Sequence, residues 1–191
     1  MRNKLLVLFL ATWIAFPAFS AWQLDSQHSA LSFVTIKKGD IAEAHKFKQL
    51  FGSLDNQGKV DFTIDLTSVD TKIAIRDQRI KEFLFNTDLF PKAHFSAQLD
   101  MTTFNNIAVG SSKMIALTGN INLHGQQQKV NTEVLVAKLS NKQFIVSSIQ
   151  PVLLNANGFS LVSGVKKLQK LAGLPSISNA VPVNFLLTFT Q

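Results

Sequence analysis

Apolar and polar residues alternate along most of the chain after Trp22. In residues 60–66, valine, phenylalanine, isoleucine and leucine occupy every second position, and polar residues lie between them. Successive side chains of a β-strand point to opposite faces, so this period of two predicts strands with one buried face and one face in water. Apolar sets of the same kind lie at 31–33, 93–99, 115–123, 130–136 and 181–189. The pattern therefore predicts an all-β protein.

Turn-forming residues separate these sets and indicate seven or eight antiparallel strands. The turns are Asp55-Asn56-Gln57-Gly58, Asn105-Asn106, His124-Gly125 and Ser140-Asn141-Lys142. Such sheets protect their edges by stacking as a sandwich or by closing into a barrel. Several apolar sets run for eight or nine residues, and Gly119 interrupts one of them where a barrel strand would bend sharply. We therefore expect a lipocalin-like antiparallel eight-stranded β-barrel, with a sandwich as the alternative.

Two segments follow a helical period instead. The first spans Arg76–Leu84, and the second spans Ser163–Leu171 and is ended by Gly173 and Pro175. The apolar residues of the first are Ile80, Phe83 and Leu84, and those of the second are Val165, Leu168 and Leu171. Charged residues occupy most of the opposite side, which predicts two short amphipathic helices. One or both would close an end of the barrel and shield its interior from water.

The inward faces of the predicted strands carry no charge, so the interior should be apolar. Phenylalanine occurs 16 times and tyrosine never, which fits an interior that makes no use of an aromatic hydroxyl. The residues expected to line a lumen are Phe33, Phe62, Ile64, Phe95, Leu117, Ile121, Val134 and Phe185. The same faces would also be compatible with a solidly packed core.

Charged residues near the first helix are candidates for holding it in place and for binding a ligand head group. Asp70, Arg76 and Asp77 are expected to form an ion-pair cluster that fixes the lid. Together with Arg79, Ile80, Phe83 and Leu84 they form the predicted lid or head-group set. The basic side chains that could bind an anionic head group are those of Arg76, Arg79 and Lys81, or those of Lys166, Lys167 and Lys170. The alternative is that these charges simply keep the helices solvated.

The N-terminus has the features of a secretory signal peptide. Two basic residues precede the apolar run Leu5–Phe16, and Ala18-Phe19-Ser20 places small residues at a cleavage site. About 20 apolar residues are needed to span a bilayer, and this run is shorter. We expect a cleaved signal peptide at residues 1–20 and a single domain at residues 21–191.

The expected mature chain is moderately basic. The sequence has 19 basic and 12 acidic side chains, and loss of Arg2 and Lys4 leaves 17 basic ones and a formal charge of +5. The chain contains neither a polybasic run nor a recognisable nucleic-acid-binding motif, so nucleic acid is not an expected partner. It has no cysteine, but a domain of this size buries about 70% of its unfolded surface and needs no disulfide.

Metal-binding and catalytic motifs are not recognisable. Zinc ligands usually come as close pairs, such as two histidines three to five residues apart, whereas the four histidines here are widely spaced, at His28, His45, His94 and His124. A hydrolase needs a nucleophile, a base and an orienting acid. Ser29 beside His28, or Ser68 near Asp70, could supply parts of such a site. Side chains that bond to backbone donors at a strand end are the simpler interpretation of residues 68–71.

Several short motifs, in order and spacing, resemble the YceI-like family. They are Trp22-Gln23-Leu24-Asp25-Ser26-Gln27-His28-Ser29, Leu31-Ser32-Phe33, Phe51-Gly52, Ser68-Val69-Asp70-Thr71, Arg76-Asp77, Phe90-Pro91 with Phe95, and Leu117-Thr118-Gly119-Asn120-Ile121-Asn122-Leu123-His124-Gly125. The resemblance implies a lipocalin-like barrel, exported to the periplasm of a Gram-negative bacterium, whose apolar cavity takes up a polyisoprenoid or similar lipid. The segment Asn155–Ser160 and the lysine-rich helix after it depart from the family pattern, which affects the expected shape of the mouth.

We expect a periplasmic protein that sequesters or transports an isoprenoid lipid or a quinone-like amphiphile without catalysis. No cofactor is expected apart from a bound polyisoprenoid or isoprenoid quinone. The sequence is also compatible with a transient membrane contact and with a homodimer. A metal-independent hydrolase or isomerase that uses polar residues at the mouth is the alternative, and a filled barrel that acts as an interaction module is a third hypothesis.

Overall fold

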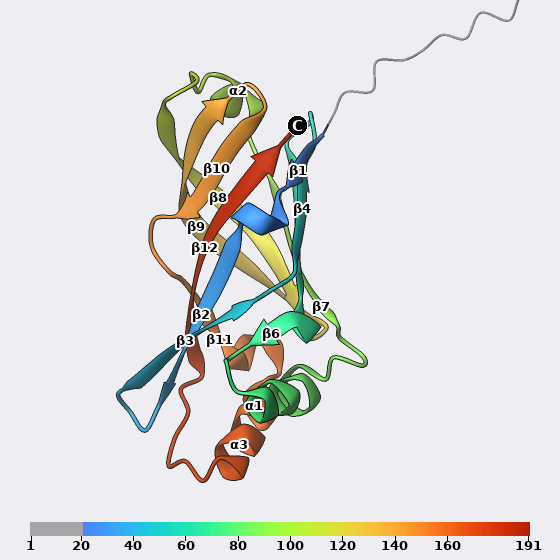
Figure 1. The fold of residues 1–191 in the computed structure, drawn as a ribbon, viewed down its shortest axis with the longest axis vertical. Coiled ribbons are helices and arrows are strands. Elements are labelled where there is room, and N and C mark those ends of the chain that lie inside the picture. Colours follow the sequence, from blue (N-terminus) through green and yellow to red (C-terminus); the bar gives the residue numbers. More distant parts are fainter. Residues whose placement is uncertain (1–20) are drawn as a thin grey trace, which may run out of the picture.

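The computed structural model describes residues 21–191, and the expected signal peptide, residues 1–20, lies outside them. Twelve β-segments make up most of this region (Figure 1). They are β1 (Trp22–Leu24), β2 (Ala30–Lys37), β3 (Ile41–Phe47), β4 (Leu50–Leu54), β5 (Lys59–Asp65), β6 (Val69–Asp70), β7 (Lys92–Gln98), β8 (Ser112–Leu123), β9 (Gln126–Ser140), β10 (Gln143–Ser148), β11 (Val152–Asn155) and β12 (Ala180–Thr190). All of the pairings between them are antiparallel.

The twelve segments form a closed barrel of eight strands, because four of the strands are each broken into two segments. The broken strands are β1 with β2, β3 with β4, β5 with β6, and β10 with β11. Closure occurs at β12, which pairs with β10 and β11 along one edge and with β1 and β2 along the other. The predicted eight-stranded antiparallel barrel is confirmed, and the sandwich alternative is wrong.

The break in the first strand is a short 3₁₀ helix, η1 (Ser26–His28), fastened to β12. Asp25 caps this helix by accepting hydrogen bonds from the backbone of Gln27 and His28. The hydroxyl of Ser29 donates to the Asp25 carbonyl and accepts from the backbone N–H of Thr188, at 2.6 and 2.9 Å. These bonds satisfy backbone groups that lose their ladder partners at the break.

The break between β3 and β4 lies beside the break between β5 and β6, and the Ser68 hydroxyl connects the two. Ser68, in the 3₁₀ helix η2 (Leu66–Ser68), accepts hydrogen bonds from the backbone N–H groups of Lys48 and Gln49. It also donates to the Asp65 carbonyl at 2.6 Å. The expectation that a side chain in residues 68–71 bonds to backbone donors at a strand end agrees with this arrangement.

The two ends of the barrel are closed differently. At one end lies α2 (Met101–Asn105), whose Phe104 packs edge-on against Trp22 and Phe144 (Figure 1). Phe144 also stacks on Phe189 at 4.9 Å, and all four rings are buried. The sequence predicted only a turn near Asn105, because this helix is a single turn capped by Asp100. This end of the barrel is sealed by a packed aromatic cluster.

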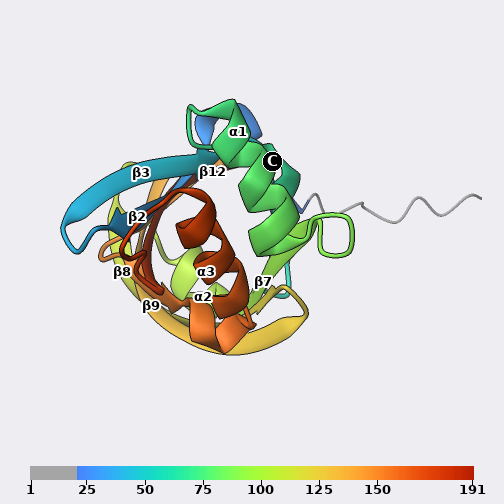
Figure 2. The same ribbon diagram turned by 90° about the horizontal axis from the view of Figure 1, so that it is seen from below.

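The other end is covered by helices that cross it side by side (Figure 2). One is α1 (Ala74–Arg79), which continues as the π-helical segment η3 (Ile80–Phe85), and the other is α3 (Val162–Leu171), which follows the 3₁₀ helix η4 (Ala156–Phe159). We call α1, η3 and α3 together the lid. A Cβ added to Gly164 of α3 would lie 2.5 Å from the Phe83 carbonyl oxygen, so glycine is what allows the two helices to approach this closely.

Both predicted amphipathic helices are therefore present, and the first is longer than expected. No helix within residues 21–191 combines the length and the apolar composition that crossing a membrane would require.

Candidate functional site

A cavity of about 240 Å³ lies inside the barrel. A single water needs only about 10–15 Å³ of such space, so the cavity can hold a guest of many carbon atoms. The wall surface is apolar, because the few polar residues that border the cavity, His94, Thr132 and Asn155, expose no polar surface to it. The structure places every residue of the predicted lumen set in this wall: Phe33, Phe62, Ile64, Phe95, Leu117, Ile121, Val134 and Phe185. Their role in binding a ligand stays a prediction.

The cavity is elongated and runs from the lid to the aromatic cluster. Leu84 and Phe85 of η3 and Val165 of α3 form its wall at the lid end, and Phe104 and Phe189 form it at the sealed end. Inward side chains in the middle of the barrel are only partly buried because they border this space. Phe95, Ile121 and Phe185 are of this kind.

Gly119 shapes the wall by making room for an aromatic ring. Its inward side is occupied by the ring of Phe95, whose Cε2 atom would lie 2.3 Å from a Cβ at this position. Phe95 and Ile121 are direct partners on β7 and β8, so the ring lies across the neighbouring strand. A ring over a strand glycine is a known way of covering exposed backbone. The missing side chain of Gly119 thus makes room for the Phe95 ring in the wall of the cavity.

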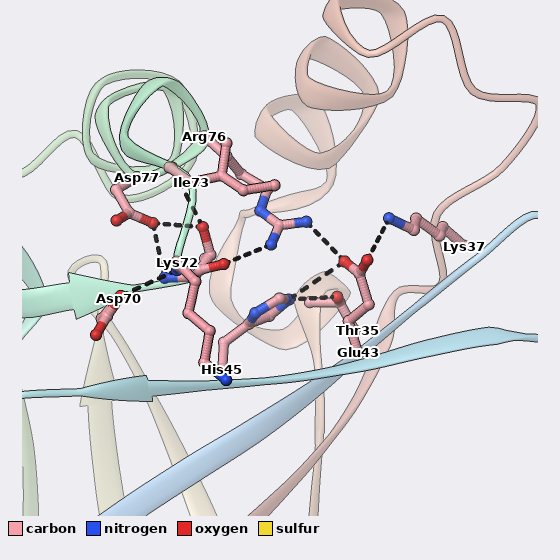
Figure 3. A network of polar contacts seen from close by, with 10 residues as sticks. Thr35, Lys37, Glu43, His45, Asp70, Lys72, Ile73, Arg76 and Asp77 are labelled. Atoms are coloured by element: carbon pink, nitrogen blue, oxygen red, sulfur yellow. Dashed lines mark hydrogen bonds and ion pairs between the residues drawn. The ribbon is translucent and has the colours of Figure 1, made fainter.

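A polar network joins the lid to the barrel wall beside the cavity (Figure 3). Arg76 of α1 donates to the Glu43 carboxylate of β3 at 2.6 Å and to the Thr71 carbonyl at 2.7 Å. The other Glu43 oxygen lies 2.8 Å from the Lys37 ammonium. Glu43 thus joins the arginine of the lid to a lysine of the wall.

His45 lies beneath this network and is only 5% exposed. Its Nε2 atom is 2.9 Å from the Thr35 hydroxyl and 4.0 Å from Glu43, and its ring packs against Phe33. The Nδ1 atom has no hydrogen-bond partner in the described residues. A buried ring with one unpaired nitrogen and an arginine nearby is expected to stay neutral.

The network lowers two pKa values, which favours the charged form of Glu43 and the neutral form of His45. Hydrogen bonds from Lys37 and then Arg76 hold the pKa of Glu43 below its usual value of 4.5. Burial, followed by repulsion from Arg76, lowers the pKa of His45 below 6.5. At neutral pH the site therefore contains a carboxylate that bridges two cations above an uncharged imidazole.

The expected ion-pair cluster of Asp70, Arg76 and Asp77 is wrong in its partners. Arg76 pairs with Glu43, whereas Asp77 accepts hydrogen bonds from the backbone N–H and the hydroxyl of Thr71. Asp70 accepts from the backbone of Lys72 and pairs with Lys48 at 3.3 Å. The backbone bond from Lys72 also lowers the pKa of Asp70. The two aspartates shape the turn into α1, and the lid is tied to the wall by a glutamate from another strand.

The remaining lid residues divide between the two faces of the helices. Ile80 is buried, and Leu84 borders the cavity. Phe83 lies at the surface beneath the Lys167 ammonium, which is 5.3 Å from the ring centre. Arg79 donates to the Leu171 carbonyl at 3.4 Å and so connects α1 with the end of α3. Lys166 and Lys170 are exposed on the outer face, so they do not reach the lumen.

The structure keeps the four histidines apart, each with its own partner. His28 bonds to Asp25, His94 bonds to Thr63, and His124 packs against Phe90. No group of three or more potential metal ligands converges anywhere in residues 21–191. Of the residues considered for a hydrolytic site, the Ser29 and Ser68 hydroxyls bond to backbone groups at two strand breaks. His28 bonds to Asp25 at η1, and Asp70 bonds to the backbone of Lys72 at the turn into α1.

The sequence did not identify Glu43 as a candidate, and it pointed to His45 only as a possible metal ligand. They lie on β3 at alternate positions that continue into Phe47, a buried residue of the cavity wall. A glutamate and a histidine on a strand face that otherwise carries Ile41 and Phe47 are the signal that could have identified them.

An eight-stranded antiparallel barrel that encloses an apolar cavity beneath a helical lid defines a lipocalin-like barrel protein. The model of the YceI-like domain matches residues 22–189. The chain therefore belongs to the YceI-like family.

Among solved structures, the chain is similar to a polyisoprenoid binding domain from Saccharophagus degradans implicated in plant cell wall breakdown. The two share 34% identity with a TM-score of 0.87, over 89% of this chain and 98% of that chain. Burkholderia cenocepacia BcnA gives 19% identity, a TM-score of 0.66, and coverage of 86% and 98%. The Campylobacter jejuni YCEI protein gives 13% identity and a TM-score of 0.56, over 77% of this chain and 84% of that chain. These last two likenesses show the fold alone. No curated protein matches the chain.

Proposed function

We propose that this protein is an exported periplasmic carrier that holds a polyisoprenoid or an isoprenoid quinone in its barrel and performs no chemistry on it. The observation that carries the proposal is the elongated apolar cavity, which runs from the lid to the aromatic cluster. The relative from Saccharophagus degradans, described as a polyisoprenoid binding domain, supports this ligand class. The signal-like N-terminus supports export.

Burial of the hydrocarbon is sufficient to drive binding. Each CH₂ group transferred from water contributes about 0.8 kcal/mol. Association and ordering oppose binding by about 4–15 kcal/mol. Four or more isoprene units contribute about 16 kcal/mol or more and exceed the whole range of that opposing term, whereas one or two units, at about 4–8 kcal/mol, fall within it. The protein should therefore select long prenyl chains over short ones, and its affinity should rise with chain length until the cavity is filled.

The lid end is the proposed route of entry. The opposite end is sealed by the four buried rings around Phe144, and opening it would break a packed core. The lid is held by the polar contacts of Arg76 and by helix packing, which can separate without breaking the barrel hydrogen bonds. A polar head group would remain near the lid, since the lumen offers it no partner.

The proposal is tested by isolating the protein with its natural cargo. The full chain is expressed with its own leader in a Gram-negative bacterium, purified from the periplasmic fraction without detergent, and examined by native mass spectrometry. We expect a complex whose excess mass is that of an isoprenoid lipid. Protein that is found only in the cytoplasm would contradict the export step. Protein that carries no lipid and takes up no added polyprenol or prenylquinone would overturn the carrier proposal.

A matched pair of variants on one strand tests whether the lumen is the site. Ile121 faces the cavity, and its neighbour Asn120 is exposed on the outer face. We expect Ile121→Trp to fill the lumen and to reduce prenyl-lipid binding about tenfold or more, as the ring displaces several buried CH₂ groups. Asn120→Trp should bind like the wild type. Equal binding by both variants would place the ligand outside the barrel.

A further inference from the structure

The outer face of the lid exposes large apolar side chains. Ile73 and Ile75, at the start of α1, are 48% and 53% exposed, and Leu171, at the end of α3, is 37% exposed. The helical period predicted that Leu171 would share the buried face of its helix, so its exposure is a departure from the expected pattern. A helix that only covers a barrel end would carry polar residues at such positions.

The exposed residues at the start of α1 and the end of α3 lie at the same end of the barrel. Ile75 and Arg79 are four residues apart, so they share a face of α1. Arg79 in turn donates to the Leu171 carbonyl, which places the end of α3 beside that face. Figure 2 views the molecule from this end, with α1 and α3 crossing it side by side. We call Ile73, Ile75 and Leu171 the lid patch.

Basic side chains surround the lid patch. Lys72 precedes α1 and is exposed, as are Lys166, Lys167 and Lys170 of α3. The helix α3 contains no acidic residue, and none follows Glu133 in the sequence. On α1 and η3 the exposed carboxylate is Glu82, because Asp77 is turned toward Thr71. The surface around the patch is therefore positive.

We propose that the lid patch and its lysines dock on an anionic lipid bilayer, which positions the lid end of the barrel for exchange of its cargo. This inference rests on the proposed carrier function. The helices whose outer faces carry the patch are those whose inner residues, Leu84 and Val165, close the cavity. Contact with a membrane would thus act directly on the elements that separate the lumen from its surroundings.

The chemistry of the surface favours a bilayer over a protein partner. Isoleucine and leucine side chains can enter the headgroup region of a membrane, and lysines on long flexible stems can follow anionic headgroups without a fixed geometry. Each basic residue near an anionic leaflet contributes about 1 kcal/mol to binding. The exposed lysines around the patch are complementary in charge to an anionic surface.

The test measures binding of the purified protein to vesicles. We expect cosedimentation with vesicles of phosphatidylethanolamine and phosphatidylglycerol, and little with vesicles of phosphatidylcholine alone. The binding should weaken as salt rises, since the Debye length falls from about 10 Å at 0.1 M to about 3 Å at 1 M. Salt-independent binding, or no binding to the anionic vesicles, would overturn the proposal without any variant.

Variants with controls at the other end of the barrel locate the contact. We expect Ile75→Asp to weaken vesicle binding about tenfold or more, and Lys166→Glu with Lys170→Glu to do the same. Met114→Asp replaces a residue that is 60% exposed on the barrel wall, and Lys113→Glu with Lys142→Glu matches the charge change. Both controls should bind as the wild type does. Thermal melting of every variant checks the fold.

Three further results would overturn the docking proposal, and lipid in the lumen is measured separately. Lid variants that bind vesicles as well as the controls would place the contact elsewhere. Light scattering that shows a dimer dissociated by Ile75→Asp without vesicles would assign the patch to a second copy of this chain. Lid variants that no longer bind a soluble protein partner but still bind vesicles would assign the lid patch to that partner. Native mass spectrometry of the same samples measures lipid in the barrel independently. A protein that carries lipid but does not bind vesicles would therefore contradict the docking proposal and leave the carrier proposal intact.

Discussion

Arg76 of the lid and Glu43 of the barrel wall form an ion pair in which the donor and acceptor atoms are 2.6 Å apart. The two residues are 33 positions apart in the sequence, and the pair joins α1 to β3 across the edge of the cavity. Their side chains are 27% and 34% exposed, so the pair is within reach of solvent and can open without burying an unpaired charge. We interpret it as a latch that sets how readily the lid opens.

The latch predicts a change in kinetics that exceeds the change in stability. An ion pair this exposed contributes about 1 kcal/mol or less to the free energy of unfolding. We expect Arg76→Gln and Glu43→Gln each to speed the release of a bound prenyl lipid severalfold, and the double variant to release it no faster than the single ones. Stopped-flow transfer to acceptor vesicles measures the rate. Lys81→Gln removes the same charge from the same helix and should leave release unchanged.

His45 predicts a loss of stability in mild acid. Its folded-state pKa lies below the unfolded value of about 6.5, so the unfolded chain binds a proton more readily. The stabilising effect of keeping it neutral is complete above pH 6.5 and declines as the pH falls through 6.5 toward the folded-state pKa. Glu43, whose pKa is also lowered, loses its contribution only when the pH falls below about 4.5. Urea denaturation at a series of pH values should show a first decline from His45 and, below about pH 4.5, a second decline. Glu43 shares the second decline with Asp25, Asp70 and Asp100, whose pKa values are also lowered.

The variant His45→Gln isolates the first step. Glutamine can still bond to Thr35 but does not titrate, so the decline that begins at pH 6.5 should disappear while the decline below 4.5 remains. A pH profile identical to that of the wild type would show that His45 is not the titrating group.

Gly119 predicts that one methyl group will disturb the lumen. A Cβ at this position would lie 2.3 Å from the Phe95 ring and 2.7 Å from the Ser96 carbonyl oxygen. We expect Gly119→Ala to destabilise the protein by about 1–3 kcal/mol and to push the ring toward the cavity. Chemical denaturation and prenyl-lipid binding measure the two effects. Gly158→Ala is the control, because a Cβ there meets only the flexible side chain of Gln128, at 3.3 Å or more.

A second substitution distinguishes the ring from the backbone as the source of the effect. Adding Phe95→Leu to Gly119→Ala removes the ring that the new methyl group meets. We expect the double variant to regain part of the lost stability. No recovery would mean that the Ser96 carbonyl contact dominates.

The wall of the cavity was predictable from the sequence because it follows from a local rule. Phe95 and Ile121 each occupy an inward position fixed by the alternation within its own strand, and the pairing of β7 with β8 then brings them together. The lid helices were predictable for the same reason, since Ile80 and Val165 mark helical faces within short segments. Both are buried, as the helical period requires.

The latch could not be predicted in the same way. Its two residues come from distant segments, and nothing in the sequence near Arg76 distinguishes Glu43 from the nearer Asp70 and Asp77. Those aspartates satisfy backbone N–H groups at the turn into α1, a local demand that the tight backbone of Lys72, with φ of 62°, makes stronger. The exposure of Leu171 could not be predicted either, because it depends on how the last turn of α3 packs against the rest of the protein.

Gly164 lies where the two lid helices pack closely, and we expect that this position does not tolerate a larger side chain. Glycine to alanine inside a helix normally stabilises it by about 1 kcal/mol. Here the added Cβ would lie 2.5 Å from the Phe83 carbonyl oxygen and 2.9 Å from the Leu84 Cα, both backbone atoms that cannot turn away. Separating the helices costs about 1–3 kcal/mol, so we expect Gly164→Ala to destabilise the protein despite the better helix former.

Ser163, next to Gly164, provides the control for the direction of this stability change. Ser163 is exposed on the same helix, and Ser163→Ala should stabilise the protein slightly or leave it unchanged. Denaturation measures both variants, and hydrogen exchange of the α3 amides should rise in Gly164→Ala alone. Because Val165 next to Gly164 closes the cavity, the same variant should also release prenyl lipid faster. An increase in stability with Gly164→Ala would show that α3 lies farther from η3 than the structure places it.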